Sequence, residues 1–414
     1  MKISCQQRFQ NQRGFSLVEL LVAMAITIIV MAAAMMMFIK SLDTNDMTML
    51  IAEMQANARA GTNALAQDIN QAGTGINWGG YTLASGGGAE NFGNNATYMN
   101  PNNFYTVPAS AGPPATPATN VMYGITPVDG GGPAIKGPAN NGTGTPVQMD
   151  GINLVYADPI LSSHDPTVSN WTTPPAPGPT VADAGANITI TMPNGMLPAV
   201  NDNNSGIRIG DVLTLGNSVV GVVSNVTPGP PAVIMLSPGD PYNLNQFGLS
   251  GSVRSLSSTF PTTGGAYPNP VSVMRLYVIT YFLQGLDAAG NPVTKANVPA
   301  QAVDFRLMRQ VNQQAATIVA EHINYLQFSY DLGDSTCLAT APMSHIPDAV
   351  EPTACGIPTA KPAYDKIRTV YINLGARSAK PDKRGVYYQT TVNTVVGPRS
   401  LSYNNTYPPD KTGP

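Results

Sequence analysis

The chain has 414 residues, which is enough for one large domain or two ordinary ones. Charged residues make up 11%, less than half of the usual ~25%, while glycine (40) and proline (37) are frequent. This balance favours an exported, loop-rich β protein over a cytosolic enzyme. The net charge of −3 lacks the basic excess of a general nucleic-acid binder, so no specific nucleic acid is predicted as a partner.

The first informative segment is an apolar run at residues 20–39, interrupted only by Thr27. At ~1.5 Å per residue, a helix of this length spans ~30 Å, the thickness of the hydrocarbon core of a bilayer. Lys2, Arg8 and Arg13 precede the run, and acidic residues follow it. The positive-inside bias therefore predicts a cytoplasmic N-terminus and an exported remainder.

A short motif lies between the basic residues and the apolar run, with the sequence Arg13-Gly14-Phe15-Ser16-Leu17-Val18-Glu19. It resembles the class III signal of type IV prepilins. The resemblance implies that prepilin peptidase cuts between Gly14 and Phe15 and methylates the new amino terminus of Phe15. No convincing Ala-x-Ala-like site, which a conventional secretory signal would carry, follows the apolar run.

Glu19 is an ionisable residue at the start of a predicted membrane helix. Such a group costs about 2.5–3.5 kcal/mol at the centre of a bilayer, less near a helix end, and usually has a partner. The resemblance implies that this partner is the free amine of a neighbouring subunit's first residue, the equivalent of Phe15, and that the pair sets the register between subunits. The alternative is an ordinary signal anchor in which Glu19 reaches the membrane interface.

The helical pattern continues beyond the membrane segment. Apolar residues recur at spacings of three and four, which gives one stripe along a helix: Met47, Leu50, Ile51, Met54, Ala58, Gly61, Leu65, Ile69 and Ala72. No proline occurs before Pro101, and Gly73-Thr74-Gly75 is a plausible stop. A helix over residues 15–72 would be ~87 Å long. Its first half is expected in the membrane and later in a filament core, and its second half against a sheet.

Residues 53–73 carry a finer resemblance. The pattern has Gln55, Asn57 and Arg59, followed by Leu65-x-x-Asp68-Ile69-x-x-Ala72-Gly73. It is similar to PilW-type minor pilins and to J-type pseudopilins. The similarity extends loosely over residues 270–400, where it implies a helix-to-strand step within residues 318–330.

The sequence predicts an α+β fold, in which the long helix packs on an antiparallel β-sheet head with long loops. Residues 1–14 form the leader, 15–40 the transmembrane and polymerisation helix, and 41–75 its amphipathic continuation. Residues 76–149 read as a Gly/Asn/Pro-rich insertion of loops with isolated strands, and 150–414 as the head. Strands are predicted at 151–156, 188–191, 207–215, 219–226, 232–236, 271–282, 302–309, 323–330, 367–374 and 385–396.

Cys337 and Cys355 are the two cysteines outside the leader. In an oxidising compartment they are expected to form a disulfide, which would stabilise the fold by about 3 kcal/mol; the alternative is two unrelated thiols. No zinc-site or nucleophile motif occurs with the three histidines. We therefore predict no catalytic residue, cofactor or metal, and no enzymatic activity.

The predicted function is that of a structural minor pilin, which enters a type IV pilus or initiates it at the tip. The expected partners are prepilin peptidase, other major and minor pilins, the inner-membrane assembly platform, a tip adhesin, and the membrane before assembly. The expected location is the inner membrane with a periplasmic head, and then the pilus. The alternatives are a J-like pseudopilin of a type II secretion system and a pilin-anchored adhesin or enzyme.

Overall fold

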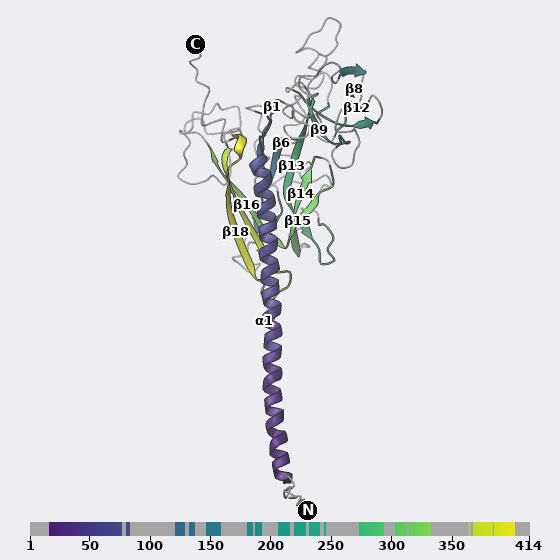
Figure 1. The fold of residues 1–414 in the computed structure, drawn as a ribbon. Coiled ribbons are helices and arrows are strands. Elements are labelled where there is room, and N and C mark those ends of the chain that lie inside the picture. Colours follow the sequence, from purple (N-terminus) through teal and green to yellow (C-terminus); the bar gives the residue numbers. More distant parts are fainter. Residues whose placement is uncertain are drawn as a thin grey trace, which may run out of the picture.

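The computed structural model shows a long N-terminal helix that carries a head of antiparallel sheets (Figure 1). The predicted α+β class is confirmed. The structure describes residues 16–76, 80–82, 121–128, 132–136, 146–158, 180–184, 187–192, 206–215, 219–228, 232–240, 244–245, 273–293, 303–312, 314–332, 364, 367–383 and 385–401.

The helix α1 (Leu17–Gln71) runs unbroken for 55 residues. It ends where predicted, because the Ala72 N–H donates to the carbonyls of the last turn and the chain then turns through two left-handed glycines. Gly73 has φ 81° and Gly75 has φ 71°, a conformation that other residues rarely adopt.

The largest sheet has seven strands and is centred on the long strand β13 (Val273–Leu286), which pairs with β6, β9 and β14. Its other strands are β3 (Ile125–Val128), β6 (Gly151–Ala157), β9 (Val212–Leu215), β10 (Val219–Val222), β14 (Asp304–Val311) and β15 (Thr317–Glu321). Among the described strands, every pairing is antiparallel.

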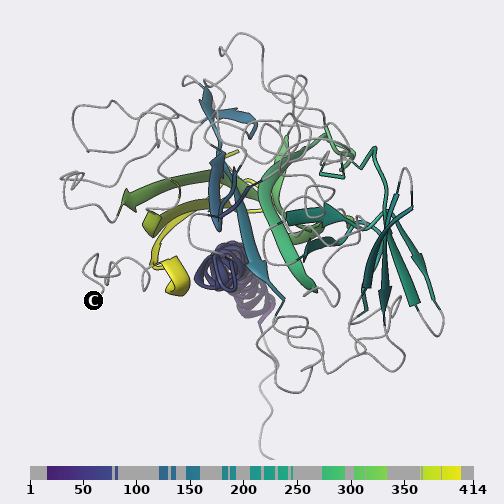
Figure 2. The ribbon, with the colours of Figure 1, turned by 90° about the horizontal axis from the view of Figure 1, so that it is seen from above.

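A second sheet of three strands contains β16 (Ile323–Leu332), β17 (Ile367–Arg377) and β18 (Gln389–Val396). It lies beside the seven-stranded sheet, and the same face of α1 packs against both sheets (Figure 2). The helix-to-strand step expected within 318–330 is wrong. Thr317–Glu321 is a strand because it pairs with β14, and His322, with φ 59°, turns the chain directly into β16.

Three further sheets complete the described head. The four-stranded sheet stands to one side in Figure 2 and contains β7 (Thr180–Ala184), β8 (Asn187–Met192), β11 (Asn225–Thr227) and β12 (Ala232–Leu236). The two-stranded sheets pair β1 (Tyr81–Thr82) with β2 (Val121–Met122), and β4 (Ala134–Lys136) with β5 (Pro146–Gln148).

Three predicted strands differ clearly from the observed ones. The strand predicted at 385–396 begins only at Gln389. The expected strand at 219–226 is two strands, because the chain leaves one sheet after β10 and joins the four-stranded sheet as β11. The expected strand at 207–215 is extended and paired only from Val212, because Gly210, with φ 89°, turns the residues before it.

The main core fills the space between α1 and the two sheets. In β16 alternate side chains point at the helix layer, and Leu326, Phe328 and Tyr330 are buried. They pair across the sheet with buried residues of β17 at every second position. Each buried side chain of this size contributes about 1.5–3 kcal/mol relative to full exposure, so this core fixes the second half of α1 in the head.

Candidate functional site

The first half of α1 presents large apolar side chains on all sides. Leu17 and Met37 are 75% exposed, and the other large apolar side chains as far as Leu42 are exposed as well. One window of this helix has a mean hydropathy of 2.6 and none of it is buried. A helix this long and apolar is able to cross a membrane, and an exposed apolar surface of this size marks a membrane or protein contact.

The helix begins with a capping box formed by Ser16 and Glu19. The Ser16 N–H donates to Glu19 Oε2 at 3.2 Å, and the Val18 N–H donates to Ser16 Oγ at 3.4 Å. This arrangement satisfies donors that a helix start leaves without partners. The expected pairing of Glu19 with a neighbouring amine stays a prediction, and Gly14 and Phe15 lie outside the described residues.

The second half of α1 turns one face into the head. Met54, Ala58, Leu65 and Ile69 on this face are buried. Gly61 lies between them at the closest approach: a Cβ there would be 3.0 Å from Leu374 Cδ2 in β17 and 3.2 Å from Leu307 Cδ2 in β14. Glycine therefore lets the helix contact both large sheets at once.

Asp68 is the polar contact that ties α1 to the seven-stranded sheet. It is 5% exposed and accepts hydrogen bonds from Tyr281 Oη at 2.6 Å, Tyr156 Oη at 3.3 Å and Arg309 Nε at 2.6 Å. These partners lie on β13, β6 and β14. A buried carboxylate needs such donors, since an unpaired buried charge is costly.

The protonation equilibria of the partners follow from this arrangement. Burial, and next the charge of Asp68, raise the pKa of Tyr156 and of Tyr281. Burial acts to lower the pKa of Arg309, but its hydrogen bond to Asp68 and the charge of Asp68 raise that pKa overall. Both tyrosines therefore stay neutral donors, and Arg309 stays charged at any physiological pH.

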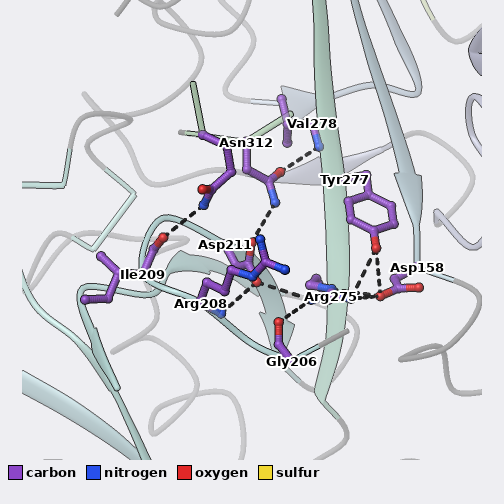
Figure 3. Close-up of polar contacts among 10 residues, drawn as sticks. Asp158, Gly206, Arg208, Ile209, Asp211, Arg275, Tyr277, Val278 and Asn312 are labelled. Carbon is purple, nitrogen blue, oxygen red and sulfur yellow. Dashed lines mark hydrogen bonds and ion pairs between the residues drawn. The ribbon is translucent and has the colours of Figure 1, made fainter. Parts of the chain in front are cut away.

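A second buried cluster surrounds Arg275, which is 5% exposed (Figure 3). Its Nε donates to Asp158 Oδ2 at 2.7 Å, and its Nη1 donates to the Gly206 carbonyl at 2.8 Å and contacts Asp211 Oδ2 at 3.4 Å. Burial acts to lower the pKa of Arg275, but Asp158 and the neighbouring groups raise it. The two carboxylates thus hold a charged guanidinium at the start of β13.

Asn312 extends this cluster to the end of β14. Its Nδ2 donates to Asp211 Oδ1 at 3.1 Å, and its Oδ1 accepts from the Val278 N–H at 2.9 Å. Tyr277 Oη donates to Asp158 Oδ2 at 3.2 Å. Because all these groups satisfy one another inside the sheet, the cluster joins β9, β13 and β14 rather than forming a reactive site.

A third polar cluster, which consists of Asp304, His322 and Arg377, links the two large sheets. His322 Nδ1 lies 2.6 Å from Asp304 Oδ2, and Arg377 Nη2 of β17 donates to Asp304 Oδ1 at 2.9 Å. The hydrogen bond to Asp304 raises the pKa of His322 despite partial burial. Burial acts to raise the pKa of Asp304, but His322 and Arg377 together hold it below its usual 3.8.

Sequence reasoning did not predict these three sets of polar contacts. Their members lie as far apart as 241 residues along the chain, in the case of Asp68 and Arg309, so no local motif marks the pairings, although Asp68 itself belongs to the pattern at residues 53–73. Cys337 and Cys355, the expected disulfide, lie outside the described residues. Among the residues that the structure describes, no group of three His, Cys, Asp or Glu side chains is placed to hold a metal ion.

Comparison with known proteins identifies one part of the chain. Residues 9–35 match the family described as the prokaryotic N-terminal methylation motif. No curated protein and no solved structure matches the chain. The match covers Arg13, the glycine junction and most of the exposed apolar half-helix. That motif, on a helix that is long and apolar enough to cross a membrane, indicates a type IV pilin-like or pseudopilin protein of the kind that prepilin peptidase processes.

Proposed function

We propose that the chain is a minor pilin of the PilW type, which is anchored in the inner membrane and then enters a type IV pilus. The observation that carries the proposal is the division of α1: one half is apolar and exposed, and the other is buried in the head. A helix of this kind needs a second environment for its first half. Lipid provides it before assembly, and sister helices provide it in the filament.

Processing creates the group that assembly uses. Cleavage between Gly14 and Phe15 would free and methylate the amine of Phe15, directly before the capping residue Ser16. Glu19 already directs its carboxylate at the start of its own helix. In the filament the same carboxylate would meet the amine of a neighbouring subunit. The pair neutralises two charges in an apolar core and fixes the axial register.

The head would transmit force to the helix as a rigid unit. The assembly platform moves the helix out of lipid, and the load passes to the sheets through the core and through Asp68. A disulfide between Cys337 and Cys355 would stabilise the exported head further. A position at the filament tip, beside other minor pilins and an adhesin, is supported by the resemblance of residues 53–73 to PilW-type minor pilins.

The decisive experiment is the variant Glu19→Ala in a strain that depends on this chain for piliation. We expect processing to stay near the wild-type level, since the cut lies before the helix, while the variant is lost from sheared pili and piliation falls at least tenfold. Glu321→Ala, which removes an exposed carboxylate of the head, is the matched control and should pilate normally. Normal piliation with Glu19→Ala would overturn the proposal.

A pseudopilin of a type II secretion system is the second candidate, because the same motif marks pilins and pseudopilins. The two functions separate in a deletion strain. Loss of pili with intact protein secretion supports the minor pilin, and loss of secretion with intact pili supports the pseudopilin.

A further inference from the structure

The turns of α1 that connect its two halves have little packing of their own. Residues 41–49 are exposed, apart from Asp43, which is half-buried. The apolar run ends before them at Ile39, and the first buried residue of the helix, Met54, comes after them. No packed core therefore fixes the helix over these turns within the described part of the chain.

The same turns favour a helix less than the segments on either side. Thr44 Oγ1 donates to the Lys40 carbonyl at 2.9 Å, and Thr48 Oγ1 donates to the Thr44 carbonyl at 2.8 Å. Hydroxyl bonds of this kind slightly destabilise a helix and often bend it. Six of the nine residues are of types with low helix propensity: Ser41, Asp43, Thr44, Asn45, Asp46 and Thr48.

The hairpin loop between β17 and β18 reaches these turns and is held in shape by its own hydrogen bonds. The Ser378 N–H donates to the Tyr388 carbonyl at 2.8 Å, and the Asp382 N–H donates to the Val386 carbonyl at 2.8 Å. Asp382 Oδ1 accepts a further bond from the Val386 N–H at 2.9 Å. These bonds fix the turn that carries Lys383.

The contact between this loop and the helix is a charged one. Lys383 forms an ion pair with Asp43, and the two side chains are 75% and 40% exposed. Water screens an ion pair this exposed, so it opens readily. Beside the pair, a groove of about 710 Å³ lies between the helix and the loop, with Asp46 and Leu50 on the helix side and Lys380 on the loop side.

We propose that residues 41–49 are a hinge in α1 and that the ion pair between Lys383 and Asp43 is a latch that keeps the hinge closed. While the latch holds, the two halves of α1 form one unbroken helix (Figure 1). When it opens, these turns lose helical hydrogen bonds and the head tilts on the apolar half of the helix. The groove gives the loop room for this movement.

The hinge and the latch are properties of the single chain and go beyond the proposed function. Only their use rests on it: the head takes one angle to the helix in the membrane and another in the filament. A latch that opens readily lets the same chain adopt both angles.

Hydrogen–deuterium exchange of the detergent-solubilised full chain, read in peptides from residues 41–49 and 54–71, tests the latch. We expect Lys383→Gln to speed exchange at 41–49 about two- to fourfold, the effect of losing an exposed ion pair, and to leave 54–71 unchanged. Asp43→Asn should have the same effect, and the double variant should add nothing further, because both remove one interaction.

Lys380→Gln is the matched control. Lys380 lies on the same loop but forms no ion pair with a described residue, so this variant should exchange as the wild type does. Salt gives a second readout, since the screening length falls to about 3 Å at about 1 M. In that salt the wild type should exchange as fast as Lys383→Gln, which should itself not respond.

The hinge is tested by Thr44→Ala combined with Thr48→Ala. Alanine favours the helix and removes both hydroxyl bonds, so exchange at 41–49 should slow by about threefold or more. No slowing in this variant, or wild-type exchange at 41–49 as slow as at 54–71, would overturn the hinge. Unchanged exchange in Lys383→Gln, or an equal change in Lys380→Gln, would overturn the latch. These outcomes are independent of filament entry, which Glu19→Ala tests.

Discussion

Single buried charges fix the contacts between elements that are distant in the sequence. Asp68 on α1 receives donors from three strands, and Arg275 lies between two carboxylates. Arg275 does not stand out in the sequence, and Asp68 appears only as a member of the pattern at residues 53–73, which indicates neither its burial nor its partners; an Asp on a helix or an Arg in a strand is usually exposed. The apolar stripe predicted which face of α1 is buried, but only the fold shows that Asp68 belongs to that face.

The variant Asp68→Asn tests the polar contact between α1 and the head. The amide keeps the shape but removes the charge that Arg309 faces, and breaking a buried pair costs about 3–5 kcal/mol. Because the Arg309 side chain is 29% exposed, we expect the free energy of unfolding to fall by the low end of this range, about 3 kcal/mol. Urea unfolding of the detergent-solubilised chain measures this fall. Glu53→Gln, at an exposed position of the same helix, should change stability by less than about 0.5 kcal/mol. Equal stability of the two variants would refute the role of Asp68.

His322 makes the stability of the head depend on pH. Its pKa is raised above 6.5, so its contribution is fully present below the unfolded-state value and is lost as the pH rises through the folded-state value. The pKa of Asp304 is lowered below 3.8, so its contribution is present above about 3.9 and is lost as the pH falls through its folded-state value. The interaction between His322 and Asp304 therefore contributes most to stability between about pH 4 and 6.

We expect His322→Asn to destabilise the head more at pH 5.5 than at pH 8.5. Asparagine tolerates the left-handed conformation at this position, so the comparison reports the lost charge rather than backbone strain. Thermal unfolding at the two pH values measures the difference. A loss of stability that is the same at both pH values would show that the ion pair does not contribute.

At the scale of elements, the sequence predicted the helix and most of the described strands. The spacing of apolar residues and Gly73 gave the extent of α1, alternating side chains gave β6 and β8, and an apolar stretch after prolines gave β12. It did not predict where a strand changes sheets, as after β10, because the apolar pattern continues through the break. It also did not separate β15 from a helix, since short amphipathic segments fit both periods.

Gly61→Leu tests how closely α1 must approach both sheets. A Leu side chain would collide with Leu374 and Leu307, and overpacking of this kind costs about 1–3 kcal/mol. Ala60→Leu, at the adjacent exposed position, is the matched control and should be neutral or slightly stabilising. Urea unfolding compares the two variants. A Gly61→Leu chain as stable as Ala60→Leu would contradict the close packing.

At the scale of the whole molecule, the two halves of α1 have different surroundings. The head buries its second half, and its first half remains apolar and exposed (Figure 1). The sequence predicted this division, because membrane length and the glycine junction are local signals. It did not predict how two sheets meet on one face of the helix, because that arrangement depends on pairings between residues far apart in the chain.

The central claim is that the chain is cut before its apolar helix and then enters a filament. Mass spectrometry of the amino-terminal peptide, from sheared pili and from membranes of the same cells, tests it most directly. We predict a peptide that begins with N-methyl-Phe15 in both fractions. A pilus fraction without this chain, or a membrane form that keeps Met1 or is cut after residue 39, would contradict it.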